Sequence, residues 1–372
     1  MKKLIPLLLC AVFLLSACQP VDLDAPVPVY DTGIDPESWA LIPAGEFLSG
    51  QFDKETDIPY DYEMMVTPVT NDQYAAYLNA ALADGSVKLS ENQIVGYYPG
   101  DVFHGARHEE EIAAGDYIYI PLDDPALRLI FDGSTFSAKP GWGNHPMTMV
   151  SWFGARAYCE YYGGRLPSEL EWEKAARGSA DNRPFPWGES ITRNRANLIF
   201  SRDPFENMAT FGSRTTPVGF YNGQVYDGYQ TLDSPSPYGL YDMAGNVWQW
   251  TGDVYENQHY RYMRGGGMNN YENALRVWVR NNATPVFTGP ATGFRCARGG
   301  KCPRGAWHEN IDRKNPSVPA ALQEPADRAA DHHRSGGLYE RALPGDALDA
   351  NGRAARLADP GGRRQHGDQH VV

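Results

Sequence analysis

The second half of the chain, from residue 184 to residue 298, is divided into short apolar segments by glycine, proline, asparagine and aspartate. Residues of these four types interrupt regular elements, so they favour short strands and turns over long helices. Trp187, Trp248, Trp250 and Trp278 lie among these segments, in a chain that is 12% aromatic and contains 38 glycines. We therefore expect a loop-rich structure that is held together by aromatic packing.

The first helical signal lies in "TPVTNDQYAAYLNAAL". Thr70 or Asn71 can act as the N-cap, because both side chains carry an oxygen that accepts a hydrogen bond from the first turn. Tyr74, Tyr77 and Leu78 then fall on one helical face. The segment predicts an amphipathic helix with this face turned toward the core.

Two further helices are predicted, one over 151–163 and one in "RLPSELEWEKAARG". In the latter, Ser168 and Glu171 form a capping box and Gly178 marks the end. Residues 82–140 show no clear periodicity and are interpreted as an insertion between core elements. Early helices and a β-rich second half together predict an α+β domain.

The N-terminus, "MKKLIPLLLCAVFLLSACQP", has the pattern of an exported bacterial lipoprotein. Its apolar run is short for a transmembrane helix and follows two lysines, as in a secretory signal. Leu-Ser-Ala-Cys matches a lipobox, so we expect residues 1–17 to be removed and Cys18 to carry the lipid anchor. An ordinary signal peptide cleaved nearby is the alternative. Gln19 in place of aspartate favours the outer membrane in a host with two membranes, and residues 18–36 are expected to form an extended tether.

The net charge and the cysteine content indicate which classes of partner and which cellular compartment to expect. A formal net charge of −13 argues against nucleic acid as a partner and against an anionic membrane surface; the lipid anchor is then the expected membrane contact. Cys159, Cys296 and Cys302 remain once the signal peptide and the lipidated cysteine are set aside. In an oxidising envelope compartment, two of them can form a persistent disulfide.

Residues 299–372 differ from the rest of the chain in composition. They are poor in aromatic and aliphatic residues and rich in Arg, Ala, Gly, Pro, Asp and His. A disordered tail is one interpretation, because such a segment cannot bury a core. Translation of a GC-rich gene out of frame is another, and a metal-binding role for the histidines is a third. No function is assigned to this tail.

Several stretches in order, "LIPAGEFLSG", "TPVTNDQYAAYLN", "MVSWFGARAYCEYYGGRLPSELEWEKAARG", "YGLYDMAGNVWQWTGD", "RGGGM" and "TGFRCAR", resemble the formylglycine-generating enzyme (sulfatase-modifying factor) family. The resemblance covers about residues 38–298, so a domain over 37–298 is expected. It implies a compact, irregular α+β fold, distantly related to C-type lectins, with little regular secondary structure. It also implies a disulfide between Cys159 and Cys296; two unpaired buried thiols are the alternative.

In catalytic members of that family, two cysteines with four residues between them bind copper in the segment before "GFRC". The matching places here hold Glu272 and Val277, and no cysteine occurs between Cys159 and Cys296. Copper(I) prefers soft thiolate ligands, which a carboxylate and an alkyl group do not replace. The resemblance therefore implies the family's scaffold without its copper or its cysteine oxidation.

The resemblance also implies bound Ca²⁺, whose oxygen ligands would come from two short segments. Asn197 and Leu198, the latter through its carbonyl, match one of them, and Asn246 and Gln249 match the other. Gln249 replaces a family glutamate and so removes one charge from a site for a hard cation. A tight turn with packed tryptophans is the alternative reading of "GNVWQW".

A different metal site is suggested by "HGARHEEE", in which His104, His108 and Glu110 have a His-x3-His-x-Glu spacing. On a helix, the two imidazoles would share one face. A solvated acidic loop is the simpler interpretation of the same residues.

Two functions remain open. The first is a lipid-anchored, non-catalytic binding or structural component, similar to lipoproteins of gliding and secretion machineries, that binds a protein or glycan at the cell surface. The second is a formylglycine-generating-type oxidase acting on sulfatase cysteines, or a related metal-dependent oxidase. The segment of the lost copper site supplies the candidate binding cleft, namely Glu272, Arg276, Val277, Trp278, Arg280 and Asn281.

Overall fold

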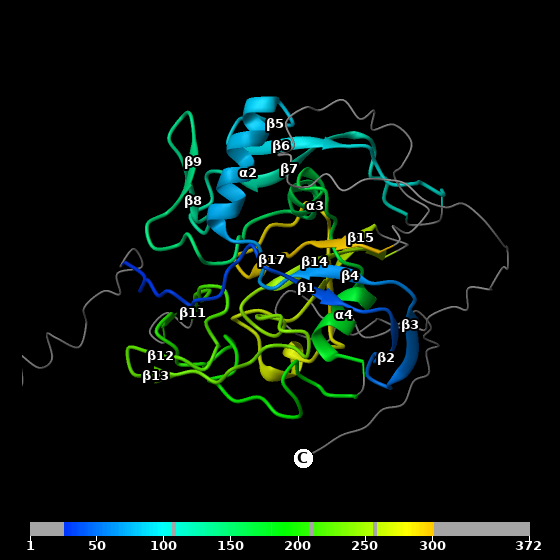
Figure 1. The fold of residues 1–372 in the computed structure, drawn as a ribbon. Coiled ribbons are helices and arrows are strands. Elements are labelled where there is room, and N and C mark those ends of the chain that lie inside the picture. The colour runs from blue at the N-terminus through cyan, green and yellow to red at the C-terminus, as the bar shows by residue number, and fades with distance from the viewer. Residues whose placement is uncertain (1–25, 106–108, 180, 208–211, 256–258, 301–372) are drawn as a thin grey trace, which may run out of the picture. The chain divides into compact units, whose positions relative to one another are not determined.

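A computed structural model describes residues 26–105, 109–179, 181–207, 212–255 and 259–300 (Figure 1). Helices and short strands alternate there with long irregular segments, which confirms the predicted α+β class with little regular secondary structure. None of the helices in these ranges is both long and apolar enough to cross a membrane. The predicted signal peptide, Cys18, Cys302 and residues 301–372 lie outside the described residues.

The described residues contain three α-helices, two of which begin at a predicted cap. They are α2 (Asn71–Asp84), α3 (Trp152–Tyr161) and α4 (Glu169–Arg177). Thr70 caps α2 and forms a capping box with Gln73, and Ser168 does the same with Glu171 in α4. Each box satisfies backbone N–H groups that a helix leaves unpaired at its start. Gly178 is the C-cap of α4, as its position in the sequence predicts.

Two sheets form the centre of the domain. One has the order β1 (Trp39–Ile42), β4 (Tyr62–Met65) and β18 (Ala297–Gly299); the other has the order β16 (Arg280–Ala283), β15 (Tyr260–Arg264), β14 (Trp248–Tyr255) and β17 (Thr292–Gly293). In the first sheet, Ala297 pairs with Met64, so the closing segment of the domain returns to its opening strands. In the second, β17 runs parallel to β14 and the other pairings are antiparallel.

Further strand pairs and another three-stranded sheet lie around these two sheets. They are β2 (Gly45–Ser49) with β3 (Lys54–Ile58), β5 (Val87–Ser90) with β6 (Gln93–Tyr98) and β7 (Gly115–Pro121), β8 (Leu129–Phe131) with β9 (Phe136–Ala138), β10 (Glu206–Asn207) with β11 (Gly212–Ser213), and β12 (Val225–Tyr226) with β13 (Tyr229–Gln230). A 3-10 helix, η2 (Glu272–Leu275), precedes β16. Figure 1 shows α2 beside β5–β7 and the β2–β3 hairpin beside α4.

Residues 82–140 are part of the core, which corrects the prediction of an insertion between core elements. Ile94, Ile120 and Phe136 belong to the main apolar cluster, together with side chains of α2 and α3. The strands here have three to seven residues and pair chiefly with one another, so each shows little periodicity of its own. Short strands depend on their partners for stability, and that information is not local in the sequence.

The predicted disulfide between Cys159 and Cys296 is confirmed. It joins α3 to the segment before β18 across 137 residues, with the two Cα atoms 5.5 Å apart. Both cysteines lie in the main apolar cluster, where Tyr74, Tyr158 and Phe294 pack with ring centroids 5.4–6.1 Å apart. The bridge therefore links an early helix to the closing segment inside an aromatic core.

Residues 26–36 do not form a free tether, so the predicted boundary at residue 37 is too late. Val27 is buried, and the ring of Tyr30 packs against those of Phe205 and Tyr226. Thr32 Oγ1 donates a hydrogen bond to the carbonyl of Val218 at 3.0 Å. An aromatic residue within a Pro- and Asp-rich segment thus attaches that segment to the domain.

Candidate functional site

Glu272 and Val277, the places matched to the copper-binding cysteines, face different environments. Glu272 begins η2 and is exposed, whereas Val277 is fully buried in a small apolar cluster with Trp172 and Leu240. The N–H group of Val277 donates to the carbonyl of Pro184 at 2.9 Å. An exposed carboxylate and a buried alkyl group offer no soft ligand pair for copper(I).

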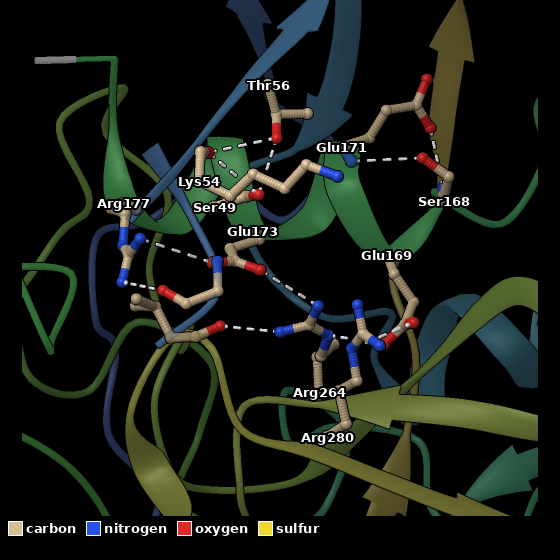
Figure 2. A network of polar contacts seen from close by, with 12 residues as sticks. Ser49, Lys54, Thr56, Ser168, Glu169, Glu171, Glu173, Arg177, Arg264 and Arg280 are labelled. Carbon is tan, nitrogen blue, oxygen red and sulfur yellow. Dashed lines mark hydrogen bonds and ion pairs between the residues drawn. The ribbon is translucent and has the colours of Figure 1, made fainter. Parts of the chain in front are cut away.

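Arg264 contacts this segment through Val277 and also contacts α4, where Figure 2 shows it beside Glu169 and Glu173. Its guanidinium is fully buried, with Nε donating to Glu169 Oε1 at 2.8 Å and Nη2 to Glu173 Oε2 at 3.1 Å. Nη1 donates to the carbonyl of Val277 at 2.9 Å. Arg264 on β15 therefore holds both α4 and the segment before β16.

The same face of α4 holds the β2–β3 hairpin. Glu173 Oε1 accepts a hydrogen bond from the N–H of Gly50 at 2.6 Å and lies 3.6 Å from Arg177 Nη1. Arg177 in turn donates to the carbonyls of Leu48 and Gly50. Because buried charges require partners, Glu169, Glu173 and Arg177 of this helix are buried as one network connected by Arg264.

Arginines also contact two partly exposed aromatic rings next to this buried network. The half-buried Trp278 ring has the Arg177 guanidinium carbon 5.1 Å and that of Arg276 5.9 Å from its centroid. Arg280 places its guanidinium carbon 5.6 Å from the Tyr262 ring centroid, and its Nε lies 3.3 Å from Glu169 Oε2. Contacts of this kind orient the arginines over the rings.

Not every residue of the predicted cleft reaches the surface. Asn281 is buried, and its Oδ1 accepts a hydrogen bond from the N–H of Asn282 at 2.9 Å. Val277 is in the core. Glu272, Arg276, Trp278 and Arg280 are the accessible residues of the predicted cleft. Arg280 lies beside Tyr262, which sequence reasoning did not select. We call Tyr262, Arg276, Trp278 and Arg280 the tryptophan–arginine surface.

Asp253 on β14 is a second residue that the sequence did not reveal. Its Oδ2 accepts a hydrogen bond from the N–H of Glu169 at the start of α4. Burial, with repulsion from Glu169 next in importance, raises the pKa of the Asp253 carboxyl from 3.8 to about 6. Nothing local marks this aspartate, because its environment comes from a helix more than 80 residues earlier.

The predicted calcium residues Asn197 and Asn246 lie together. Asn197 Nδ2 is 3.4 Å from Asn246 Oδ1 and donates to the carbonyl of Arg214 at 2.7 Å. Asn197 Oδ1 is buried and accepts no hydrogen bond within the described residues, and the same holds for Thr216 Oγ1 nearby. Two such oxygens fit a hard cation or a water molecule.

Gln249 does not fit as a calcium ligand in this arrangement. Its Oε1 accepts hydrogen bonds from Trp172 Nε1 at 2.9 Å and from Arg295 Nε at 2.7 Å. Its Nε2 donates to the carbonyl of Asp242 at 2.7 Å. The amide oxygen has thus used both lone pairs, and the arginine already supplies a positive charge. The Leu198 carbonyl accepts a hydrogen bond from the N–H of Ser201 at 3.0 Å.

The predicted His104–His108–Glu110 arrangement is only partly described, because His108 lies outside the described residues. His104 Nδ1 lies 3.2 Å from Glu109 Oε1 instead. Glu109 and Asp101 bracket the buried His259, at 3.0 Å from its Nε2 and 2.7 Å from its Nδ1. In the part of the chain with described positions, no group of three or more His, Cys, Asp or Glu side chains is arranged to hold a metal.

The fold, the disulfide and the segment before β16 define a formylglycine-generating-enzyme-like domain without a cysteine pair at the matching place. The chain belongs to the family of the sulfatase-modifying factor enzyme 1-like domain, whose family model matches residues 30–299. That match confirms the resemblance and also begins before residue 37.

Relatives of this chain differ in their named activities. It is 32% identical to the formylglycine-generating enzyme of Streptomyces coelicolor, over 69% of this chain and 87% of that enzyme. It is 29% identical to the serine/threonine-protein kinase pkn1 of Chlamydia pneumoniae, and 37% identical to the inactive C-alpha-formylglycine-generating enzyme 2 of Bos taurus. These matches cover 69% and 45% of this chain, but only 37% and 56% of the two relatives.

Among solved structures, PvdO from Pseudomonas aeruginosa is similar, with 23% identity and a TM-score of 0.44 over 73% of this chain and 98% of PvdO. The relatives named above include a formylglycine-generating enzyme and a protein named inactive. Family membership is thus compatible with either a catalytic or a non-catalytic chain.

Proposed function

We propose that this protein is a non-catalytic binding or structural component, displayed from the bacterial cell envelope by a lipid on Cys18. One observation carries the proposal. No cysteine occurs between Cys159 and Cys296, and these two are joined to each other. The domain thus has no free thiolate at the segment where catalytic relatives would bind copper(I).

The tryptophan–arginine surface supports a binding role. Tryptophan, tyrosine and arginine are the residues that most often dominate binding energy at interfaces. Arg280 and Trp278 are oriented by contacts with Glu169 and Arg177, which belong to the buried network of α4. A surface that is already ordered loses less entropy when it binds, so it suits a protein or glycan ligand at the cell surface.

The rival function is a formylglycine-generating-type oxidase that acts on sulfatase cysteines, or a related metal-dependent oxidase. Its support is the 32% identity that extends over 87% of the Streptomyces coelicolor enzyme. An oxidase of this kind would require a reaction that does not begin from a copper-bound pair of thiolates.

One assay separates the two functions. The chain from residue 19 to residue 372, with its disulfide intact, would be incubated with copper and a peptide that contains Cys-x-Pro-x-Arg. Mass spectrometry would report conversion of the peptide cysteine to formylglycine, and the Streptomyces coelicolor relative would serve as the positive control. We expect no conversion above the level without protein. Conversion by this chain would refute the non-catalytic proposal.

The lipid anchor needs a test of its own. In cells fed a labelled fatty acid, we expect the full-length chain to carry label and to fractionate with the outer membrane. The Cys18→Ala variant should lose both properties, because the thioether requires that sulfur. Label that persists in the variant would place the modification elsewhere and reject Cys18 as the anchor.

A further inference from the structure

Two exposed aromatic rings lie beside the segment of the lost copper site. Phe200 exposes 42% of its surface and Tyr271 exposes 61%. Their ring centroids are 6.4 Å apart, with the ring planes inclined at 58°. Tyr271 is the N-cap of η2 and immediately precedes Glu272. Neither ring belongs to a buried apolar cluster of the described domain.

Phe200 has a backbone conformation that a bulky residue rarely adopts. Its φ is +65°, and Arg202 has φ +58°, both in the left-handed region where a Cβ atom is crowded. Glu206 holds both residues, because its Oε1 accepts the N–H of Phe200 at 2.6 Å and its Oε2 accepts that of Arg202. One carboxylate therefore holds two residues with left-handed backbones, on either side of Ser201.

The strain is not offset by burial of the phenylalanine ring. A glycine would adopt this backbone without crowding, yet the chain places a large, half-exposed ring there. Strained residues that persist in this way cluster at binding and active sites. The conformation of Phe200 therefore indicates that its ring serves in binding and not in packing of the domain.

The two rings are also held relative to each other. The N–H of Ile199 donates to the carbonyl of Asn270 at 3.0 Å, which joins the residues that precede Phe200 and Tyr271. Asn270 is buried, and its Oδ1 accepts a hydrogen bond from the N–H of Gly267 at 2.9 Å. The pair is thus preorganised, which lowers the entropy lost on binding.

We propose that Phe200 and Tyr271 form a platform for a neutral glycan. This inference rests on the proposed function as a binding module and adds to it a second surface, with a stated ligand class. Aromatic rings present an apolar face to the apolar face of a sugar ring. The neighbouring exposed residues Arg202, Glu272 and Asn273 carry donors and acceptors for hydroxyl groups. Because the charges of Arg202 and Glu272 are opposite, their surroundings favour a neutral, hydroxyl-rich ligand over an ion.

Calorimetric titration with cellotetraose and chitotetraose would test the platform on the chain from residue 19 to residue 372. We expect at least one of these neutral oligosaccharides to bind. The Phe200→Ala and Tyr271→Ala variants should each bind it about tenfold more weakly or not at all, which corresponds to about 1.4 kcal/mol. Phe52→Ala is the matched control, because Phe52 is 91% exposed in the β2–β3 turn and should not affect binding.

Thermal unfolding checks that the variants fold and that the backbone is strained. Phe200→Gly should unfold at a higher temperature than Phe200→Ala, because glycine relieves the left-handed strain while both variants lack the ring. A lower unfolding temperature for the glycine variant would contradict the argument from strain and overturn the platform.

Three binding results would also overturn the glycan assignment. One is that neither sugar binds at concentrations up to about 10 mM, well above a 1 mM dissociation constant. The second is that Phe200→Ala binds as the unmodified chain does. The third is Phe200-dependent retention of an unstructured peptide pool without sugar binding, which would make the pair a peptide site. The formylglycine assay does not depend on these three results. Failure of the glycan platform would therefore leave the non-catalytic proposal intact.

Discussion

Arg264 Nη2 lies 3.1 Å from Glu173 Oε2, and the exposed fraction of neither side chain exceeds 1%. Arg264 also contacts Glu169 at 2.8 Å, so one cation is shared by two carboxylates on successive turns of α4. Burial of charges is costly unless each has partners, and loss of one partner leaves the rest uncompensated. The pair therefore fixes the position of α4 under the segment that carries the tryptophan–arginine surface.

The first prediction concerns this pair. Arg264→Met should lower the free energy of unfolding by about 3–5 kcal/mol, because two buried carboxylates lose the buried cation that they share. Lys88→Ala is the control, since Lys88 and its partner Asp116 are 65% and 41% exposed and the pair should contribute less than about 1 kcal/mol. Urea unfolding measures both. Equal losses in the two variants would contradict the role given to burial.

The elements that the sequence predicts well are those with a local chemical signal. Thr70 and Ser168 cap α2 and α4 as predicted, because a cap and its partner lie three residues apart. The disulfide between Cys159 and Cys296 followed from family resemblance, since no local signal joins residues this distant. The expected α+β class needed only the contrast between the two halves of the chain.

What the sequence could not show depends on contacts between distant segments. Residues 82–140 contain short strands that become recognisable only when paired. Asp253 becomes unusual only because α4 begins beside it, and Val277 turns inward only because Trp172 and Leu240 form a cluster there. Candidate site residues were found by position in the chain, but their exposure required the fold.

The second prediction concerns the disulfide. Replacing Cys159 and Cys296 together by alanine should lower the free energy of unfolding by about 4–5 kcal/mol, because a bridge over a loop this long restricts the unfolded chain. Denaturant unfolding of the double variant, compared with the unmodified chain before and after reduction, measures the change. If reduction leaves the unfolding midpoint unchanged, the bridge does not stabilise the domain by restricting the unfolded chain.

The third prediction concerns pH and Asp253. Its carboxyl has a pKa of about 6 in the folded chain, against an ordinary value of 3.8, because burial and Glu169 disfavour the charge. The folded state therefore binds the proton more tightly, and this carboxyl lowers stability as pH rises from about 4 to about 6. Asp253→Asn cannot ionise and can still accept the N–H of Glu169.

The variant should therefore unfold at a higher temperature than the unmodified chain at pH 7.5. The difference should shrink as pH falls through 6 and become small below 4, where both side chains are neutral. Thermal unfolding from pH 4 to pH 8 measures it, and the comparison at each pH cancels other titrating groups. A difference that stays constant over this range would show that Asp253 does not titrate as expected.

The last prediction concerns calcium. Asn197 Oδ1 and Thr216 Oγ1 are buried without a partner among the described residues, whereas both ends of the Gln249 amide are hydrogen-bonded. If Ca²⁺ binds this chain, we therefore expect it at Asn197. Calcium at 100 times its dissociation constant should add about 2.7 kcal/mol to the free energy of unfolding. Asn197→Ala should abolish this increment and Gln249→Ala should retain it, although each substitution lowers the starting stability.

The increment is measured as the change in thermal unfolding between chelator and calcium. An increment that survives in Asn197→Ala but is lost in Gln249→Ala would move the ion to the other segment, and no increment in the unmodified chain would reject calcium as a ligand.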